Sequence, residues 1–385
     1  MQQRFLLLLG LSLAGLLLAS CSRGPALTWP GVAADSQYVY IAQSQQVHAV
    51  NLADGRQVWS FPTAADSNIS QIVSQPGVGP DVIVVGSEGA SGTTSGIVYG
   101  LDRNTGTKKW CLAFDQKGAD SQQCPLAKGG AVNGVLGIAP AIDDRMLGGV
   151  TLTNSVAYFG LASGLVYAVD AETGKDLWYF KAERDVWAAP LVTADTVYVT
   201  ALDHHVYALD VKTGALHWQK DMGAAVAGAP TLDKGTLFVG TFANQLAALD
   251  AASGEQKWTF ATQNWVWSGP TVANGVLYFT DVSGNVFAAD EATGQQKWTV
   301  KPGGQMRAQP VLAGDSLYVG DHDGNFFALD PATGSTRWTK TQKGQILVPA
   351  VVVSDTILVA PYSGDNLLMA YGPDGTLKWP YNPSK

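Results

Sequence analysis

The sequence predicts an all-β fold, an eight-bladed β-propeller of four-stranded antiparallel blades. Eight tryptophans each follow a turn glycine by four residues, and from the third tryptophan onward they recur at intervals of 40, 40, 40, 40 and 41 residues. A repeat of about 40 residues in a β-rich chain is typical of propeller blades with four strands. The eight tryptophans are Trp59, Trp110, Trp178, Trp218, Trp258, Trp298, Trp338 and Trp379.

Residues 189–218 show how one repeat forms a blade. Pro190 stands at the start of the first strand, where no ladder hydrogen bond needs its missing N–H group. The pattern Asp-x-x-Thr-Gly from Asp210 to Gly214 predicts a turn before the fourth strand, because Asp and Thr bond nearby backbone N–H groups and glycine adopts a positive φ. The four strands are expected at 189–192, 196–199, 206–209 and 215–219.

Each repeat tryptophan falls in the fourth strand of its blade, from where we expect it to face the neighbouring blade. Burial of an indole side chain removes roughly 150–250 Å² from water. At about 25 cal/mol per Å² this burial stabilises the fold by several kcal/mol. The eight repeat tryptophans are therefore interpreted as structural.

The first 21 residues indicate export and lipid attachment. Arg4 precedes an apolar run from Phe5 to Ala19, which is short for a membrane-spanning helix and suits a signal peptide. The run ends in Leu-Ala-Ser-Cys21, which resembles the lipobox of bacterial lipoproteins and implies lipid attachment to the Cys21 thiol. The alternative is an ordinary signal peptide that happens to contain a cysteine. The expected organisation is a lipoprotein signal peptide at 1–20, a lipidated N-terminus and linker at 21–29, and the propeller at 30–385.

Lipidation implies a location outside the cytoplasm, on a membrane. Several acyl chains on one residue anchor a protein durably, whereas a single chain does not. Ser22 follows the cysteine, and the lack of an Asp there resembles lipoproteins that are sorted to the outer membrane. We expect a membrane-anchored protein on the periplasmic face of the outer membrane, or on the outer face of the cell membrane in a one-membrane organism.

Composition limits the classes of partner. Charged residues make up 15% of the chain, the net charge is −8, and no cluster of Lys and Arg is present, which disfavours nucleic-acid binding. With Cys21 assigned to lipid, Cys111 and Cys124 remain as an even pair in an oxidising compartment, where a disulfide is expected. Two free thiols are the alternative.

The core of the repeat is the pattern Tyr-Ala-[Leu/Val]-Asp-x-x-Thr-Gly-x-x-x-Trp, which is clearest at 167–178 and 207–218. This pattern resembles the repeats of pyrroloquinoline-quinone (PQQ)-type propellers, and the resemblance covers nearly all of residues 30–380. Two groups share the repeat. One contains quinoprotein alcohol and glucose dehydrogenases, and the other contains non-enzymatic lipoproteins such as BamB of the outer-membrane β-barrel assembly machinery.

The resemblance favours the second group. Quinoprotein dehydrogenases are longer, and many have a disulfide between adjacent cysteines and a calcium site, which needs six to eight oxygen ligands. Cys111 and Cys124 are not adjacent, and no such ligand set is evident; Asp321-His322-Asp323 and Asp203-His204-His205 are interpreted as turns. We expect a monomeric scaffold without catalytic residues, cofactor or metal, docking protein partners that include, as one candidate, a β-barrel assembly complex. The alternative is a PQQ-binding quinoprotein dehydrogenase or a small-molecule-binding propeller.

Candidate partner-binding residues lie in the loops between blades, which open on the face around the central channel. Three positions before each first-strand proline stand Trp187, Ala227, Trp267 and Arg307, and Trp265 lies beside them. These tryptophans are outside the repeat, so blade packing does not account for them. Trp and Arg are enriched in binding hot spots. The alternative is that the rings plug the channel or pack against a neighbouring loop.

Three insertions depart from the repeat. The stretch from Gly86 to Asp102 has 6 extra residues and the loop from Trp110 to Pro140 has 18, relative to the fourth repeat, and both are expected on the channel face. A third insertion, around Asp143 to Thr153, is expected on the opposite face. Long loops on a rigid scaffold are where binding residues concentrate.

Overall fold

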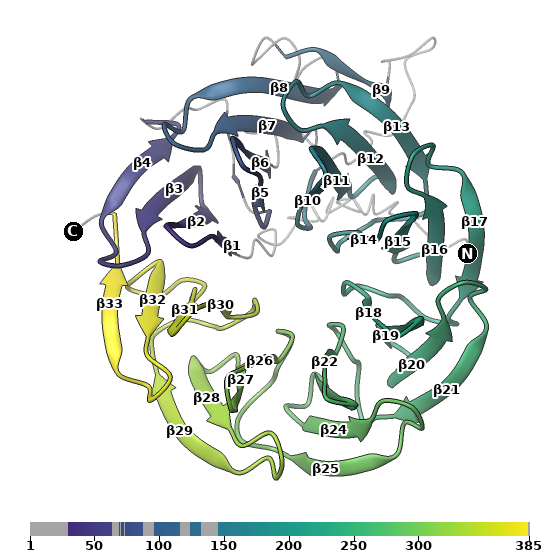
Figure 1. Cartoon of the computed structure of the whole chain (residues 1–385), viewed down its shortest axis with the longest axis vertical. Coiled ribbons are helices and arrows are strands. Elements are labelled where there is room, and N and C mark those ends of the chain that lie inside the picture. The colour runs from purple at the N-terminus through teal and green to yellow at the C-terminus, as the bar shows by residue number, and fades with distance from the viewer. Residues whose placement is uncertain are drawn as a thin grey trace, which may run out of the picture.

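The protein is an eight-bladed β-propeller, as the repeat predicts. The computed structural model describes residues 30–63, 69, 71–72, 74–87, 96–115, 124–131 and 145–383. Eight sheets surround a central axis, and in each blade the strands run outward in chain order (Figure 1). The predicted signal peptide at 1–20, Cys21 and the linker at 21–29 lie outside the described residues.

The first four blades follow one another along the chain. Blade 1 contains β1 (Gly31–Ala34), β2 (Tyr38–Gln43), β3 (Gln46–Asn51) and β4 (Gln57–Phe61). Blade 2 contains β5 (Gly77–Val78), β6 (Val82–Ser87), β7 (Ile97–Asp102), β8 (Lys108–Asp115) and β9 (Leu126–Ala131). Blade 3 contains β10 (Thr151–Thr153), β11 (Val156–Gly160), β12 (Leu165–Asp170) and β13 (Asp176–Lys181). Blade 4 contains β14 (Leu191–Val192), β15 (Thr196–Thr200), β16 (His205–Asp210) and β17 (Leu216–Asp221).

The last four blades repeat the same plan with little variation. Blade 5 contains β18 (Thr231–Asp233), β19 (Thr236–Thr241), β20 (Gln245–Asp250) and β21 (Gln256–Ala261). Blade 6 contains β22 (Thr271–Ala273), β23 (Val276–Thr280), β24 (Val286–Asp290) and β25 (Gln296–Val300). Blade 7 contains β26 (Val311–Ala313), β27 (Ser316–Gly320), β28 (Asn325–Leu329) and β29 (Thr336–Thr341). Blade 8 contains β30 (Val351–Val353), β31 (Thr356–Val359), β32 (Leu368–Tyr371) and β33 (Leu377–Tyr381).

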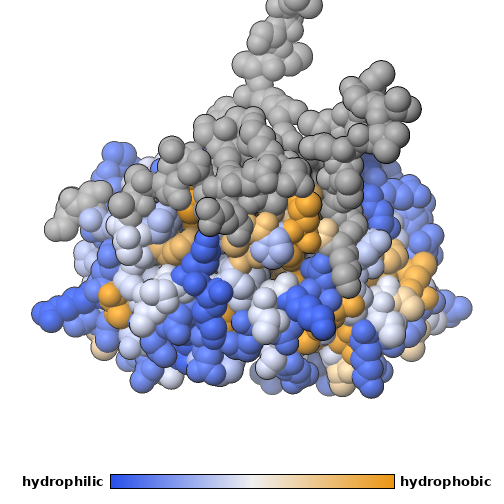
Figure 2. Space-filling model, turned by 90° about the horizontal axis from the view of Figure 1, so that it is seen from above, coloured by the Kyte–Doolittle hydropathy of each residue, from blue (hydrophilic) through white to orange (hydrophobic). Residues whose placement is uncertain are grey.

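Within a blade, burial falls from the middle strands to the outer strand. In β15 and β16 the central residues are buried, whereas β17 alternates exposed and half-buried positions because only one of its faces meets a neighbouring blade. The side of the ring is accordingly rich in hydrophilic residues, with apolar residues between them (Figure 2). The hydrophobic core is thus divided among the interfaces between blades.

Each repeat tryptophan lies against the turn glycine of the next blade. A Cβ atom added at Gly254 would lie 2.7 Å from Cε3 of Trp218, and Gly254 has a φ of +74°. The indole N–H of Trp218 donates to the carbonyl oxygen of Ala251 in the same turn, at 3.2 Å. The glycine is therefore required twice, once for its φ and once for the space that the indole occupies.

The same contacts close the ring between the last blade and the first. The indole N–H of Trp379 in β33 donates to the carbonyl oxygen of Leu52 at 3.1 Å, and a Cβ atom added at Gly55 would lie 2.5 Å from the Trp379 ring. Among the described strands, blades 1 and 8 share none, since blade 1 contains β1–β4 and blade 8 contains β30–β33. Closure therefore depends on side-chain packing between these two blades.

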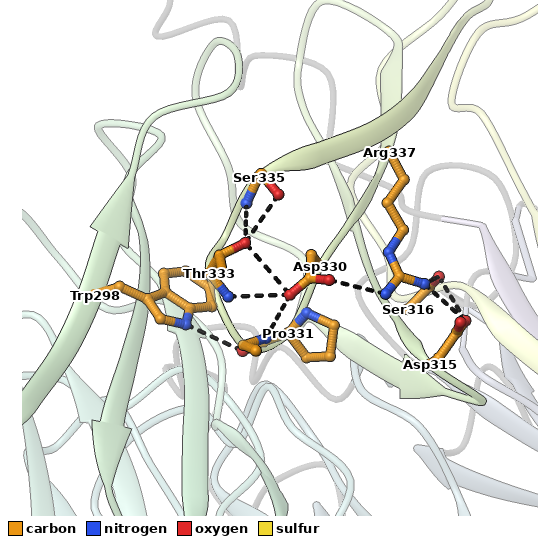
Figure 3. A network of polar contacts seen from close by, with 9 residues as sticks. Trp298, Asp315, Ser316, Asp330, Pro331, Thr333, Ser335 and Arg337 are labelled. Carbon is orange, nitrogen blue, oxygen red and sulfur yellow. Dashed lines mark hydrogen bonds and ion pairs between the residues drawn. The ribbon is translucent and has the colours of Figure 1, made fainter.

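The turn that receives the indole is itself held by its Asp and Thr residues. Figure 3 shows the turn at Asp330, where Trp298 donates to the carbonyl oxygen of Pro331 at 3.0 Å. Oδ1 of Asp330 accepts from the N–H of Thr333 at 3.1 Å, and Oδ2 accepts from Arg337 at 2.9 Å. The Asp-x-x-Thr-Gly pattern thus shapes the surface on which the preceding blade packs.

The expected position of the third insertion is wrong. The first strand of blade 3 begins at Thr151, and the short connection from β10 to β11 is the turn at Asn154 and Ser155. Val150 stands where six of the other seven blades have proline, and its N–H group donates to the carbonyl oxygen of Gln75 at 3.0 Å. The sequence has Pro140 but no proline at position 150. Using proline as the marker therefore placed the first strand of blade 3 too early in the chain. Residues 145–150 therefore belong to the connection on the channel face, and residues 132–144 lie outside the described residues.

Blade 2 has a fifth strand that the repeat does not predict. β9 pairs in parallel with β8, with Ala113 opposite Leu126. A disulfide joins Cys111 in β8 to Cys124, just before β9, with their Cα atoms 5.3 Å apart, and both cysteines are buried. The bond ties the start of the extra strand to the outer strand of the blade.

Candidate partner-binding site

The loops between blades on the channel face are fixed to both neighbouring blades. In the loop before blade 6, the N–H of Val266 donates to the carbonyl oxygen of Thr241 in blade 5 at 3.1 Å. The preceding residue, Trp265, accepts from the N–H of Val282 in blade 6 at 2.9 Å. Val266 is fully buried, as are the residues at the same position in neighbouring loops: Val186, Val226, Met306 and Ile346. The side chains on either side of this buried residue are presented on a rigid backbone.

Three of the predicted residues form one continuous row, which we call the mouth row: Trp187, Trp267 and Arg307. The ring centroids of Trp187 and Trp267 lie 6.3 Å apart, with an interplanar angle of 33°. Arg307 places its Cζ atom 4.5 Å from the centroid of the Trp267 ring, a cation–π geometry. The equivalent position in the intervening loop is Ala227, which has only a methyl group as its side chain. The structure thus brings these three residues together, although they come from three separate loops.

A second pair of aromatic residues extends the row. Trp265 stacks on Phe242, with centroids 4.6 Å apart and an interplanar angle of 8°, and Phe242 lies 5.0 Å from Trp267. Trp265 is 44% exposed, although it is a large aromatic residue. Phe242 was missed by the sequence analysis, because it lies in the loop between β19 and β20. Aligning the loops after each second strand would have found it, since Leu202, Val282 and His322 occupy the same position.

The electrostatics of the site centre on Arg307. This residue is half-buried, and burial alone lowers the pKa of its guanidinium. Its Nε atom is buried without a hydrogen-bond partner, and no carboxylate of the described chain forms an ion pair with it. Burial, together with the charge on Arg307, also lowers the pKa of His322, whose Nε2 atom likewise lacks a partner. Trp187 differs, because its indole N–H donates to Asp185 at 3.2 Å.

The two aspartate-rich motifs serve as turns. The carboxylate of Asp321 is fully buried and accepts hydrogen bonds from Gly304, Asp323 and Asn325. Asp203 accepts from the N–H of Glu183 at 2.8 Å and from the hydroxyl of Tyr207 at 2.8 Å. Among the residues that the structure describes, no group of three or more His, Cys, Asp or Glu side chains could hold a metal ion.

Comparison with known proteins gives the family. A family model described as outer membrane protein assembly factor BamB matches residues 22–123, 94–230 and 203–364, which together span most of the chain. The chain belongs to this BamB family of PQQ-repeat propellers. A search of curated proteins finds no match.

This chain shares its fold with a solved BamB structure and with a computationally designed protein. BamB from Moraxella catarrhalis is 20% identical, with a TM-score of 0.64 over 86% of this chain and 90% of that chain. The computationally designed protein Ika8 is 15% identical, with a TM-score of 0.68 over 92% and 96% of the two chains. A designed protein matches the propeller as well as BamB does, so the fold alone does not select a function. Within the described part of the chain, no helical segment has the length and apolar character of a membrane span.

Proposed function

We propose that this chain is a lipid-anchored extracytoplasmic scaffold that docks a protein partner at the mouth of its channel, in a BamB-like role in outer-membrane protein assembly. The observation that carries the proposal is the mouth row with its flanking Trp265–Phe242 stack, on loops that both neighbouring blades hold rigid. Rigid aromatic residues lose little conformational entropy on binding, and Trp and Arg dominate interface hot spots. The family match supports a scaffold over an enzyme.

Docking is tested by comparing variants of the mouth row with a matched variant elsewhere on the same face. Trp267→Ala and Arg307→Ala should each reduce capture of native partners by the purified protein. Gln345→Ala is the control, because Gln345 is exposed and holds the same loop position before blade 8 as Trp265 holds before blade 6. Loss of about 2 kcal/mol at a hot spot weakens affinity roughly 30-fold. Capture that is unchanged in both mouth-row variants would place the docking surface elsewhere.

The proposed anchor is lipid on Cys21, which would hold the propeller at the periplasmic face of the outer membrane. Cys21→Ser should move the protein into the soluble exported fraction or leave its signal peptide uncleaved. Fractionation after a high-salt wash separates lipid anchoring from electrostatic attachment. Recovery of mature Cys21→Ser protein in the washed membranes would show that lipid is not the anchor.

A second candidate function is binding of a planar anionic small molecule such as PQQ. The stacking of Arg307 on Trp267 favours it, because a flat carboxylated ring can contact both groups. The test is to mix the purified protein with PQQ and Ca²⁺. A bound quinone spectrum with dye-linked oxidation of alcohols or sugars would replace the scaffold proposal, whereas the scaffold proposal predicts neither.

A further inference from the structure

The guanidinium of Arg307 has a different kind of partner from those of Arg103 and Arg337. Arg103 pairs with Asp35 at 2.8 Å, and Arg337 pairs with Asp315 at 2.8 Å and with Asp330 at 2.9 Å. Arg307 is half-buried like Arg103, but its contact is the face of Trp267, and its Nε atom has no hydrogen-bond partner. A cation that is removed from water without a counter-ion costs free energy, and a carboxylate that completes its hydrogen bonds recovers that cost.

We propose that the mouth row recognises an acidic side chain in an extended segment of the partner protein, with Arg307 as the carboxylate receptor. This inference rests on the proposed docking function and names the chemistry of the segment that docks. The segment carries Asp or Glu next to an aromatic or aliphatic residue. The carboxylate pairs with Arg307, while the apolar neighbour lies against the exposed Trp265–Phe242 stack.

The geometry of the arginine supports this assignment. A guanidinium that lies over an indole face directs its N–H groups outward around its edge, and in Arg307 these groups form no hydrogen bond or ion pair with the described residues. The planar fork of a guanidinium matches the two oxygens of a carboxylate, so one acidic side chain can satisfy two donors at once. Stacking on Trp267 fixes the plane of the fork, which lowers the entropy lost when the ion pair forms.

The arrangement of aromatic residues favours a peptide segment over a single ion. The contacts run from Trp187 through Trp267 to Phe242 and Trp265, so the apolar surface lies directly beside the cation. An acidic residue flanked by an apolar one would contact both parts simultaneously. Although the chain has a net charge of −8, the half-buried cation at the mouth favours acidic segments among possible partners.

The experiment selects peptides from a phage-displayed random library on the detergent-solubilised full-length protein, and on its Arg307→Gln, Trp267→Ala and Gln345→Ala variants. Wild type and Gln345→Ala should enrich sequences with Asp or Glu beside an aromatic or aliphatic residue. Arg307→Gln should lose the acidic preference and keep the apolar one. For a synthetic peptide of the selected sequence, Arg307→Gln and the acid-to-amide change in the peptide should each weaken binding roughly 10- to 30-fold.

The two changes together should weaken binding by little more than either alone, because both remove the same ion pair. Additive effects, or enriched peptides without acidic residues, would overturn the carboxylate assignment. Peptides that require Trp267 but are indifferent to charge would overturn only this inference and leave the docking function standing. A selection in which no peptide depends on Trp267 would count against both.

Discussion

Tryptophans in the outer strands and tryptophans at the channel mouth have different roles. Trp218, in the outer strand of blade 4, contacts the ring of Tyr198 in its own blade at 6.0 Å and the turn at Gly254 in the next. Trp267, at the mouth, contacts Trp187, Phe242 and Arg307, which are side chains from other loops. The outer-strand tryptophan packs on the backbone turn of the next blade, whereas the mouth tryptophan packs among loop side chains and presents apolar surface. The surroundings of a tryptophan therefore indicate its role.

The largest expected change in stability is at the outer-strand tryptophans. Trp218→Ala should lower the free energy of unfolding by roughly 3–5 kcal/mol, because it leaves a cavity between blades 4 and 5 and removes the hydrogen bond to Ala251. Denaturant unfolding measures this change. Trp265→Ala is the matched control, because Trp265 is 44% exposed and should change stability much less. Equal losses of unfolding free energy in the two variants would contradict the different roles assigned to outer-strand and mouth tryptophans.

A smaller effect is expected at the glycine that faces this tryptophan. Gly254→Ala should destabilise by about 1–2 kcal/mol from its positive φ alone, with a further cost from the Cβ atom lying 2.7 Å from the Trp218 ring. In the double variant with Trp218→Ala the steric part should disappear, so the two changes should not add. Full additivity in a double-mutant cycle would show that the glycine is needed only for its backbone conformation.

The smallest expected effect is a pH dependence at the mouth. Burial lowers the pKa of His322 in the folded protein, and Arg307 lowers it further, while Asp321 and Asp323 act in the opposite direction. The unfolded chain therefore binds the proton more readily, so stability is lost as the pH falls through the ordinary histidine value of about 6.5 toward the lower folded value.

His322→Gln should reduce this acid-side loss when unfolding is measured at pH 7 and at pH 5. The pKa of His48 is also lowered by burial, but His48 is present in both proteins and cancels in the comparison. A loss between these two pH values that is identical in wild type and variant would assign the effect to other groups.

The sequence predicted the regular part of the fold well because its signals are local. The repeat defines the tryptophan, the turn and the strand period, and the structure confirms eight blades. Val150 replaces the proline that precedes the first strand in six other blades, so the start of blade 3 was misplaced. The parallel strand β9 is set by pairing with β8 across an insertion, for which the repeat contains no signal.

The candidate site was predicted in part. Counting back from each proline identified Trp187, Trp267 and Arg307, because equivalent positions in equivalent loops share a face. Contacts between different loops could not be read in the same way. Trp187 contacts Trp267 across the loop before blade 5, and Phe242 contacts Trp267 from a different type of loop, so neither contact follows from the repeat.

The central claim is that the mouth tryptophans are available for binding because they do not hold the blades together. Its most direct test is equilibrium unfolding of Trp267→Ala beside Trp218→Ala under the same conditions. We expect Trp267→Ala to lose about 1 kcal/mol, as for contacts between aromatic side chains. Trp218→Ala should lose roughly 3–5 kcal/mol, because it also removes the hydrogen bond to Ala251 and the packing on the turn at Gly254. A loss for Trp267→Ala as large as that for Trp218→Ala would contradict the account, because the Trp267 ring would then be part of the structural core.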